Sequence, residues 1–301
     1  MTLAPERRPL LTIVVYHYVR DADPRFPAMK ARTVAEFEGQ LDYIERHYEP
    51  VRLEDVRAAY AGERALPERG CLLTFDDGVS DHRDTVVPAL ARRGLPGCFA
   101  AAADAVLERH VLDVQKSQFA LAAEPDHRLV LDRVLAAVEP FAAERPELAP
   151  AELSARYAGD DRFDDADTVL VKRLLQYALP EDARRAVLNR LFAELVTSDE
   201  RAFADELYVS LDDLRAFREQ GLEIAGHGVG HLHLGKLDRD SQRQEIDGTR
   251  GFLARIGDGE HGRWTMSLPS GSYDSATIDL LREAGCALAM TVEARLAGPD
   301  A

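Results

Sequence analysis

Two adjacent carboxylates, Asp76 and Asp77, follow the apolar run Cys71–Phe75 and precede Gly78. Like charges in a half-buried site repel each other, and a bound cation would offset that cost. The turn that Gly78 permits lets the two side chains diverge, so that one can bind a metal while its neighbour faces a bound water. The alternative is that the two aspartates cap a helix and the glycine lies in the turn.

A second group of candidate ligands consists of His227 and His231, with His233 close behind. They follow the predicted strand Leu222–Ala225, and two histidines four residues apart can converge on one ion from a helical turn or from a tight loop. Together with Asp77 they would supply three N/O ligands and leave a position for water, as in catalytic zinc sites. The alternative for each histidine is a packing or capping role.

The elements that must position these residues alternate between predicted strands and helices. The strands are expected at Leu10–Val19, Cys71–Phe75, Gly97–Ala101, Leu222–Ala225 and Cys286–Val292, and the helices at 33–48, 84–93, 210–220, 240–256 and 274–284. The Thr33–Glu36 pair forms a capping box at the start of the first helix. Such alternation is typical of parallel β-α units, in which active-site residues collect at the carboxyl ends of the strands.

One long stretch interrupts the alternation. Residues 111–206 show helical periodicity, as in Val130, Val134 and Val138, and no convincing strand. We therefore predict an α/β fold of parallel β-α units built from residues 1–110 and 207–301, with an all-helical insertion at 111–206. The insertion has 12 Lys and Arg against 20 Asp and Glu, and its net charge of −8 is half of the total. We expect the insertion to cover or flank the mouth of the α/β fold and to decide the identity of the substrate.

The composition excludes several classes of protein. The 301 residues are 46% hydrophobic and 30% charged, which is not the composition of a disordered, collagen-like or membrane-spanning chain. A net charge of −16 argues against nucleic-acid binding, because phosphates are neutralised by clustered Lys and Arg. Three cysteines without a C-x-x-C pair disfavour a disulfide framework and a cysteine zinc site. The N-terminal apolar run resembles a strand rather than a signal peptide or membrane anchor, so a cytoplasmic protein is expected.

Three motifs together resemble the polysaccharide deacetylases, which are carbohydrate esterase family four and have the NodB-homology fold. They are Thr-Phe-Asp-Asp-Gly at 74–78, the strand that ends in His-x-x-x-His at 227–231, and the segment Leu268–Tyr273. Tyr16-His17 on the first strand resembles the subgroup that begins with Tyr-His. The likeness covers residues 10–110 and 207–292 and implies a distorted (β/α) barrel.

The resemblance also implies a metal centre and roles for single residues. Asp77, His227 and His231 would bind a divalent metal, for which zinc fits best, although Co, Mn or Fe also suit one carboxylate and two imidazoles. Asp76 would be the general base that deprotonates the attacking water. A bound divalent ion lowers the pKa of water and polarises an amide carbonyl. Many relatives use a C-terminal histidine as general acid, but the last histidine here is His261.

The Tyr-His subgroup offers His17 as the general acid instead, and the alternative for His17 is a core histidine that donates to a backbone carbonyl. The sequence departs from the family pattern at several places. Gly228 stands where Ser or Thr is usual, and Ser270 where Tyr is usual. The Ser270 N–H would contribute to an oxyanion hole, and Ser270 and Tyr273 would line the substrate groove. Arg263 lies out of register with the arginine that often braces the base.

Three further histidines, His82, His110 and His127, have no partner at a telling spacing and are predicted to be ordinary surface or capping residues.

Together, the motifs and the resemblance predict a metal-dependent hydrolase that removes an N-acetyl or similar acyl group from an amino sugar or a sugar-containing metabolite. The alternatives are a hydrolase of another C–N bond, such as a formamide or cyclic amide, and a catalytically silent protein that binds a sugar or a partner.

Overall fold

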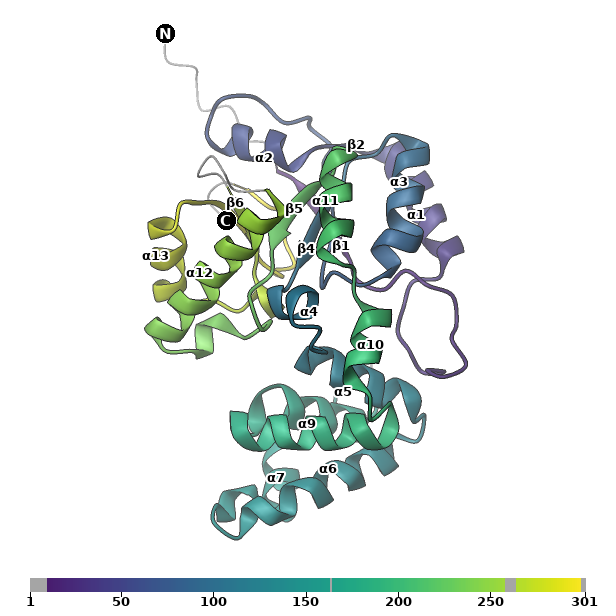
Figure 1. The fold of residues 1–301 in the computed structure, drawn as a ribbon, viewed down its shortest axis with the longest axis vertical. Helices are drawn as coiled ribbons and strands as arrows, with labels where there is room; N and C mark the ends of the chain where they lie inside the picture. Colours follow the sequence, from purple (N-terminus) through teal and green to yellow (C-terminus); the bar gives the residue numbers. More distant parts are fainter. Residues whose placement is uncertain (1–9, 163, 258–263, 299–301) are drawn as a thin grey trace. The chain divides into compact units, whose positions relative to one another are not determined.

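The computed structural model describes residues 10–162, 164–257 and 264–298, and its contacts divide the chain into two compact units (Figure 1). The first unit comprises the described parts of Met1–Asp21, Ala31–His110 and Asp205–Ala301. The second comprises Ala22–Lys30 and the described parts of Val111–Ala204. Among the described residues, no helix combines the length and the apolar character needed to cross a membrane.

The first unit contains a parallel sheet with the strand order β1-β3-β4-β5-β6-β7 and the two-residue β2 paired to β3. The strands are β1 (Thr12–Tyr16), β2 (Glu49–Pro50), β3 (Gly70–Phe75), β4 (Cys98–Ala101), β5 (Glu223–Gly226), β6 (Trp264–Ser267) and β7 (Cys286–Met290). An antiparallel bridge joins Leu11, before β1, to Ala297, after β7, and so links the two ends of the strand order. The parallel sheet confirms the predicted α/β class.

The strand register aligns the residues that follow each strand. Tyr16 of β1 pairs with Phe75 of β3, so His17 and Asp76 are the next residues at the carboxyl ends of neighbouring strands. Gly226 of β5 pairs with Met266 of β6, so His227, the next residue after Gly226, lies at the carboxyl end of β5. Side chains alternate between the two faces of a strand. Because the strands are parallel, their carboxyl ends lie at one edge of the sheet, and segments far apart in the sequence present side chains there.

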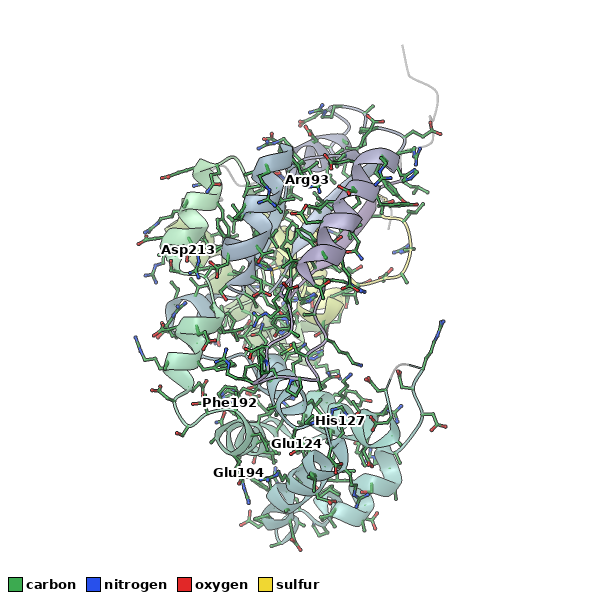
Figure 2. All side chains as sticks on the ribbon, turned by 90° about the vertical axis from the view of Figure 1, so that its right-hand side faces the viewer. Arg93, Glu124, His127, Phe192, Glu194 and Asp213 are labelled. Atoms are coloured by element: carbon green, nitrogen blue, oxygen red, sulfur yellow. The ribbon has the colours of Figure 1, made fainter. Side chains whose placement is uncertain are left out.

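Helices pack on the sheet around two apolar cores. Those of the first unit are α1 (Val34–His47), α2 (Leu53–Tyr60), α3 (Val87–Arg93), α4 (Ala103–Leu107), α11 (Leu211–Glu219), α12 (Arg239–Ile256) and α13 (Ser275–Glu283). The predicted Thr33–Glu36 capping box is present, and α3 ends at Gly94, whose φ of 65° is the left-handed cap that glycine favours. Arg93, labelled in Figure 2, pairs with Glu38 of α1 at 2.6 Å.

The elements of the first unit that were not predicted include the strands β2 and β6 and the helices α2 and α4. The β6 sequence Trp-Thr-Met-Ser is fully buried, but it is short and contains two hydroxyl residues. Such a segment has neither an apolar run nor a regular alternation, so only its pairing with β5 and β7 defines it as a strand.

The regular elements that the structure describes in the second unit are all helices. Its helices are α5 (Asp113–Ala123), α6 (His127–Ala142), α7 (Pro150–Tyr157), α8 (Ala166–Arg173), α9 (Glu181–Leu195) and the first part of α10 (Glu200–Leu207). Phe192, labelled in Figure 2, packs edge-on against Phe203 with ring centroids 5.3 Å apart. Phe26 joins the same aromatic cluster at 4.8 Å from Phe119, which places 22–30 with the helices and not with the barrel residues, where the predicted division put it.

Candidate metal centre

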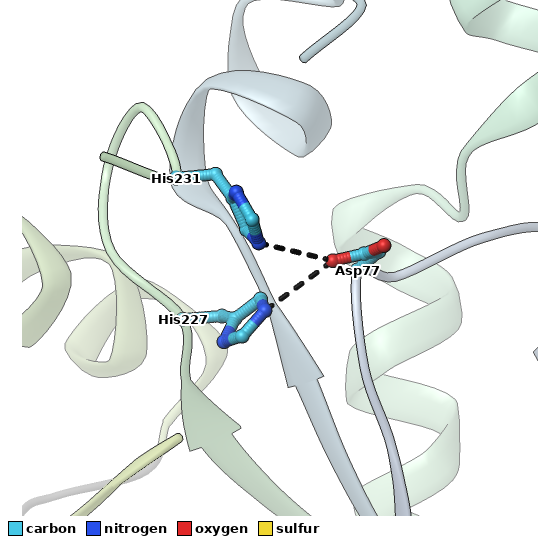
Figure 3. Close-up of side chains that lie close together, drawn as sticks. All are labelled: Asp77, His227 and His231. Carbon is cyan, nitrogen blue, oxygen red and sulfur yellow. Dashed lines mark ion pairs between the residues drawn. The ribbon is translucent and has the colours of Figure 1, made fainter. Parts of the chain in front are cut away.

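Asp77, His227 and His231 converge at the carboxyl ends of β3 and β5 (Figure 3). The Asp77 Oδ1 lies 3.3 Å from the Nε2 of His227 and 3.4 Å from the Nε2 of His231. One potential ligand atom from each residue lies within 4.8 Å of those of the other two. The three predicted ligands are thus brought together from segments 150 residues apart in the sequence.

A strained turn after β3 aims Asp77 at the histidines. Asp77 has a φ of 74° and Gly78 a φ of 66°, so two successive residues adopt the left-handed conformation. This conformation is uncommon for a residue with a Cβ atom and is concentrated at functional sites. A Cβ at Gly78 would lie 2.8 Å from the Cβ of Ala101, so the position also requires glycine for space.

The histidine loop is a tight loop rather than a helical turn. Gly228 has a φ of 78° and His231 a φ of 55°. Glu245 of α12 accepts hydrogen bonds from the N–H groups of Val229, at 2.8 Å, and Gly230, at 3.2 Å. Gly228 lacks the hydroxyl that usually follows the first histidine, and the Glu245 carboxylate holds the loop from another element. Sequence reasoning missed Glu245, because it lies 14 residues beyond the motif.

The hydrogen bonding of His227 favours a cation between the ligands. Its Nδ1 lies 2.8 Å from the backbone oxygen of Ser267, which can only accept, so Nδ1 carries the hydrogen. In the neutral ring, Nε2 then presents a lone pair towards a carboxylate oxygen of Asp77. Two facing lone pairs are stabilised by a proton or a metal ion between them. A backbone partner on the second ring nitrogen is also the usual arrangement of a histidine that binds a metal.

The charges of the site also favour a bound cation. Burial lowers the pKa of His227, but the charge of Asp76 and the contact with Asp77 outweigh it and raise that pKa to about 9. Burial would raise the pKa of Asp77, yet the hydrogen bond from His227 and the charge of His231 hold it well below its usual range. Burial and the charge of His227 lower the pKa of His231 to about 4. The two carboxylates therefore create a buried site that stabilises positive charge.

Asp76 lies beside this triad and is held by β6, a strand that was not predicted. The Ser267 Oγ at the end of β6 donates to the Asp76 Oδ2 at 3.1 Å, while the Asp76 Oδ1 is buried without a hydrogen-bond partner among the described residues. Burial is the main cause that raises the pKa of Asp76, against the charges of His227 and His17. Arg263, considered as a brace from the sequence, lies outside the described residues.

His17 follows β1 with an exposed side chain, which does not fit the alternative of a core histidine. It is close enough that its charge lowers the pKa values of both Asp76 and Asp77. Its backbone oxygen accepts a hydrogen bond from the Nε2 of His82 at 3.1 Å. The prediction of a surface or capping role is wrong for His82, which is fully buried.

The two predicted groove residues lie on the segment after β6. Ser270 is exposed, and its φ of 53° places it in the left-handed region within a short turn. Tyr273 is also exposed, and its hydroxyl donates to the Glu293 Oε1 at 2.8 Å. The groove function of both residues stays a prediction, and Glu293 is a further polar group beside Tyr273 that the sequence did not indicate.

Residues 195–289 match the model of the family described as polysaccharide deacetylase. A poly-beta-1,6-N-acetyl-D-glucosamine N-deacetylase of Escherichia coli K12 is 37% identical over 89 residues, which are 29% of this chain and 13% of that protein. The match thus spans only about an eighth of the length of this relative.

Solved structures with a similar fold include two deacetylases. The Streptococcus pyogenes deacetylase PplD, in complex with acetate, has a TM-score of 0.58 and 13% identity, over 98% of this chain and 88% of that one. The BpsB deacetylase domain of Bordetella bronchiseptica has a TM-score of 0.54 and 16% identity, over 99% and 94% of the two chains. At these identities the similarity concerns the fold, and it confirms the expected NodB-type barrel.

Proposed function

We propose that this chain, whose residues 195–289 match the model of the polysaccharide deacetylase family, is a metal-dependent hydrolase of an N-acyl group on an amino sugar. The named Escherichia coli relative is a deacetylase of a polymer of N-acetyl-D-glucosamine, which supports N-acetylglucosamine as the reacting unit. The expected cytoplasmic location would favour a sugar-containing metabolite as the substrate, and the family favours a polysaccharide.

Asp77, His227 and His231 fit a divalent metal, because one carboxylate oxygen and two imidazole nitrogens face a common point. Zinc, cobalt, manganese and iron all accept such a set of ligands. A bound divalent ion would lower the pKa of a water molecule and polarise the acyl carbonyl. The hydrogen bond from His227 to Ser267 and the hold of Glu245 on the loop fix the direction of the ligands.

One observation carries the assignment of the base, namely the buried and unpartnered Oδ1 of Asp76 beside the triad. Its second oxygen is held by Ser267, so the first is oriented to accept the proton of the attacking water. The raised pKa of Asp76 makes this carboxylate a better proton acceptor than an exposed aspartate.

His17 would complete the reaction from the other side of Asp76. Water adds to the acyl carbon and gives its proton to Asp76, and the C–N bond then breaks. The departing nitrogen must gain a proton to leave as an amine, and His17 is the exposed titratable group next to Asp76 on the neighbouring strand. The products are the free amino sugar and a carboxylate, which is acetate for an N-acetyl substrate.

The test measures bound metal and acetate release from N-acetylglucosamine and its β-1,6-linked oligomers. Asp76→Asn should keep the metal and lose about 10²–10⁴-fold in kcat, which is the usual contribution of general acid-base catalysis. His227→Ala should lose the metal and the activity together. A wild-type protein that binds no divalent metal and hydrolyses none of these sugars would contradict the proposal. Comparison of the monomer with the oligomers separates a metabolite substrate from a polysaccharide.

A further inference from the structure

The segment that carries His17 is held by two consecutive side chains, Asp81 and His82. The His82 Nε2 lies 3.1 Å from the backbone oxygen of His17. The Asp81 Oδ2 accepts a hydrogen bond from the N–H of Val19 at 2.8 Å. Both contacts connect segments more than 60 residues apart, and together they fasten the backbone on each side of Tyr18.

The surroundings of His82 leave it one role as a donor. The ring is fully buried and packs edge-on against Phe75 and Phe99, with centroids 5.9 and 5.5 Å apart. A carbonyl oxygen only accepts, so the Nε2 must carry the hydrogen that it donates to His17. Burial lowers the pKa of His82 to about 4, which keeps the ring neutral and this tautomer fixed near neutral pH.

Asp81 supports the same segment with an ion pair. Its Oδ2 also accepts from the Arg20 Nε at 2.8 Å, and its Oδ1 lies 2.5 Å from the second guanidinium nitrogen of Arg20. The Asp81 side chain is 7% exposed and that of Arg20 is 23% exposed, so water screens this pair only in part. The backbone two residues after His17 is therefore anchored by a charged pair.

We propose that His82 is a positioning residue for the general acid, because it fixes the backbone from which the exposed imidazole of His17 projects. The proposal rests on the proposed function. His82 begins a π-helical turn, His82–Val86, five residues after Asp77. Short π-helical segments are frequent at functional sites. A single stretch, residues 76–82, then holds the base, one metal ligand and the support of the acid.

The exposure of His17 makes this support important. An exposed side chain has few contacts of its own, so the position of its ring depends on the position of its backbone. A displacement of about 1 Å at a reacting group can cost about 10²-fold in rate. His82 lies outside the metal triad and its loop, so its loss should affect the proton donor and leave the metal site intact.

The test compares His82→Leu with His82→Gln. Leucine fills the apolar pocket without a donor, whereas the glutamine amide nitrogen can reach the place of Nε2 and donate. We expect His82→Leu to lower kcat about 10–100-fold, with KM and metal content unchanged, and His82→Gln to restore most of kcat. In a His17→Ala background, His82→Leu should have no further effect on kcat, because the group through which it acts is gone.

A second measurement is independent of activity. Hydrogen exchange at the amide of Val19 should be faster in His82→Leu than in the wild type or in His82→Gln. If His82→Leu does not fold, His82→Asn replaces it, because the shorter amide cannot reach the His17 oxygen.

Equal kcat in wild type and His82→Leu, additive effects with His17→Ala, or loss of metal in His82→Leu would overturn the positioning role alone. A metal-free and inactive wild type would overturn the proposed function as well.

Discussion

Two loops of the candidate site are fastened by carboxylates in different ways. The loop after β5, which carries His227 and His231, is held by Glu245 through two consecutive backbone N–H groups. The segment after β1, which carries His17, is held by Asp81 through one backbone N–H and an ion pair with Arg20. Burial is the main cause that raises the pKa of Glu245, and the two backbone hydrogen bonds that it accepts oppose this shift.

The difference reflects what each loop has to hold. The histidine loop needs two ring nitrogens in fixed positions, and a short loop with Gly228 in the left-handed region, braced from the next helix, is sufficient. The His17 segment continues into residues 22–30, which belong to the helical unit. Its anchoring comes from a distant part of the chain, at Asp81 and His82. We therefore expect metal affinity to depend on the first brace and proton transfer on the second.

The largest effect is expected in the pH dependence of stability through His82. Its pKa of about 4 in the folded protein lies below the ordinary 6.5, so between these values the unfolded chain binds the proton and the folded protein does not. The free energy of unfolding should therefore decrease as the pH falls from 6.5 to 4. At 1.36 kcal/mol per pH unit, the loss attributable to His82 is about 3 kcal/mol.

Denaturant unfolding of wild type and His82→Gln over this pH range measures the contribution. Other titrating groups, including His231, are common to both proteins and cancel in the difference. The difference in the free energy of unfolding between the two proteins should shrink by about 3 kcal/mol as the pH falls from 6.5 to 4. Parallel curves would mean that His82 is protonated normally and that its hydrogen bond to His17 has another form.

Replacing each of the two supporting carboxylates in turn tests the comparison directly. Glu245→Ala removes the carboxylate whose Oε2 accepts from both Val229 and Gly230, and it should weaken metal binding about 10–100-fold, as the loss of groups that orient metal ligands does. Asp81→Asn should leave metal affinity unchanged and lower kcat. Competition with a chromophoric chelator measures the affinity. Equal effects of both variants on metal affinity would remove the distinction between the two loops.

The smallest effect is expected from restoring the hydroxyl that the histidine loop lacks. Gly228→Ser places a Cβ at a φ of 78°, where it would lie 3.1 Å from the Glu245 Oε2 and 3.3 Å from the Pro269 Cγ. The left-handed conformation costs a residue with a Cβ about 1–2 kcal/mol, so the free energy of unfolding should fall by about this amount.

Gly251→Ser is the matched control for Gly228→Ser, since Gly251 lies in α12 with open space around it. The control should be neutral or slightly stabilising because glycine is unfavourable within a helix. If Gly228→Ser stabilised the protein and tightened metal binding, the loop would be under-braced and the role of Glu245 smaller than the geometry indicates.

Sequence alone determined the features that depend on neighbouring residues. Apolar runs predicted β1, β3, β4, β5 and β7, and a local signal predicted the capping box at Thr33. Polar residues directly after two of these strands predicted Asp76, Asp77, His227 and His231 as a group, because parallel strands present their carboxyl ends at one edge. These inferences need only the order of residues along the chain and the periodicity of each element.

The tertiary structure alone decided which groups support the site. Ser267 meets Asp76 across 191 residues, and Asp81 meets Val19 across 62, so no local pattern connects them. His82 has no ligand-like spacing in the sequence, and only the packing of its buried ring against Phe75 brings its Nε2 within hydrogen-bond distance of the His17 backbone oxygen. Hydrogen bonds between distant segments depend on how the strands and helices pack, and a periodicity of two or 3.6 residues carries no information about that packing.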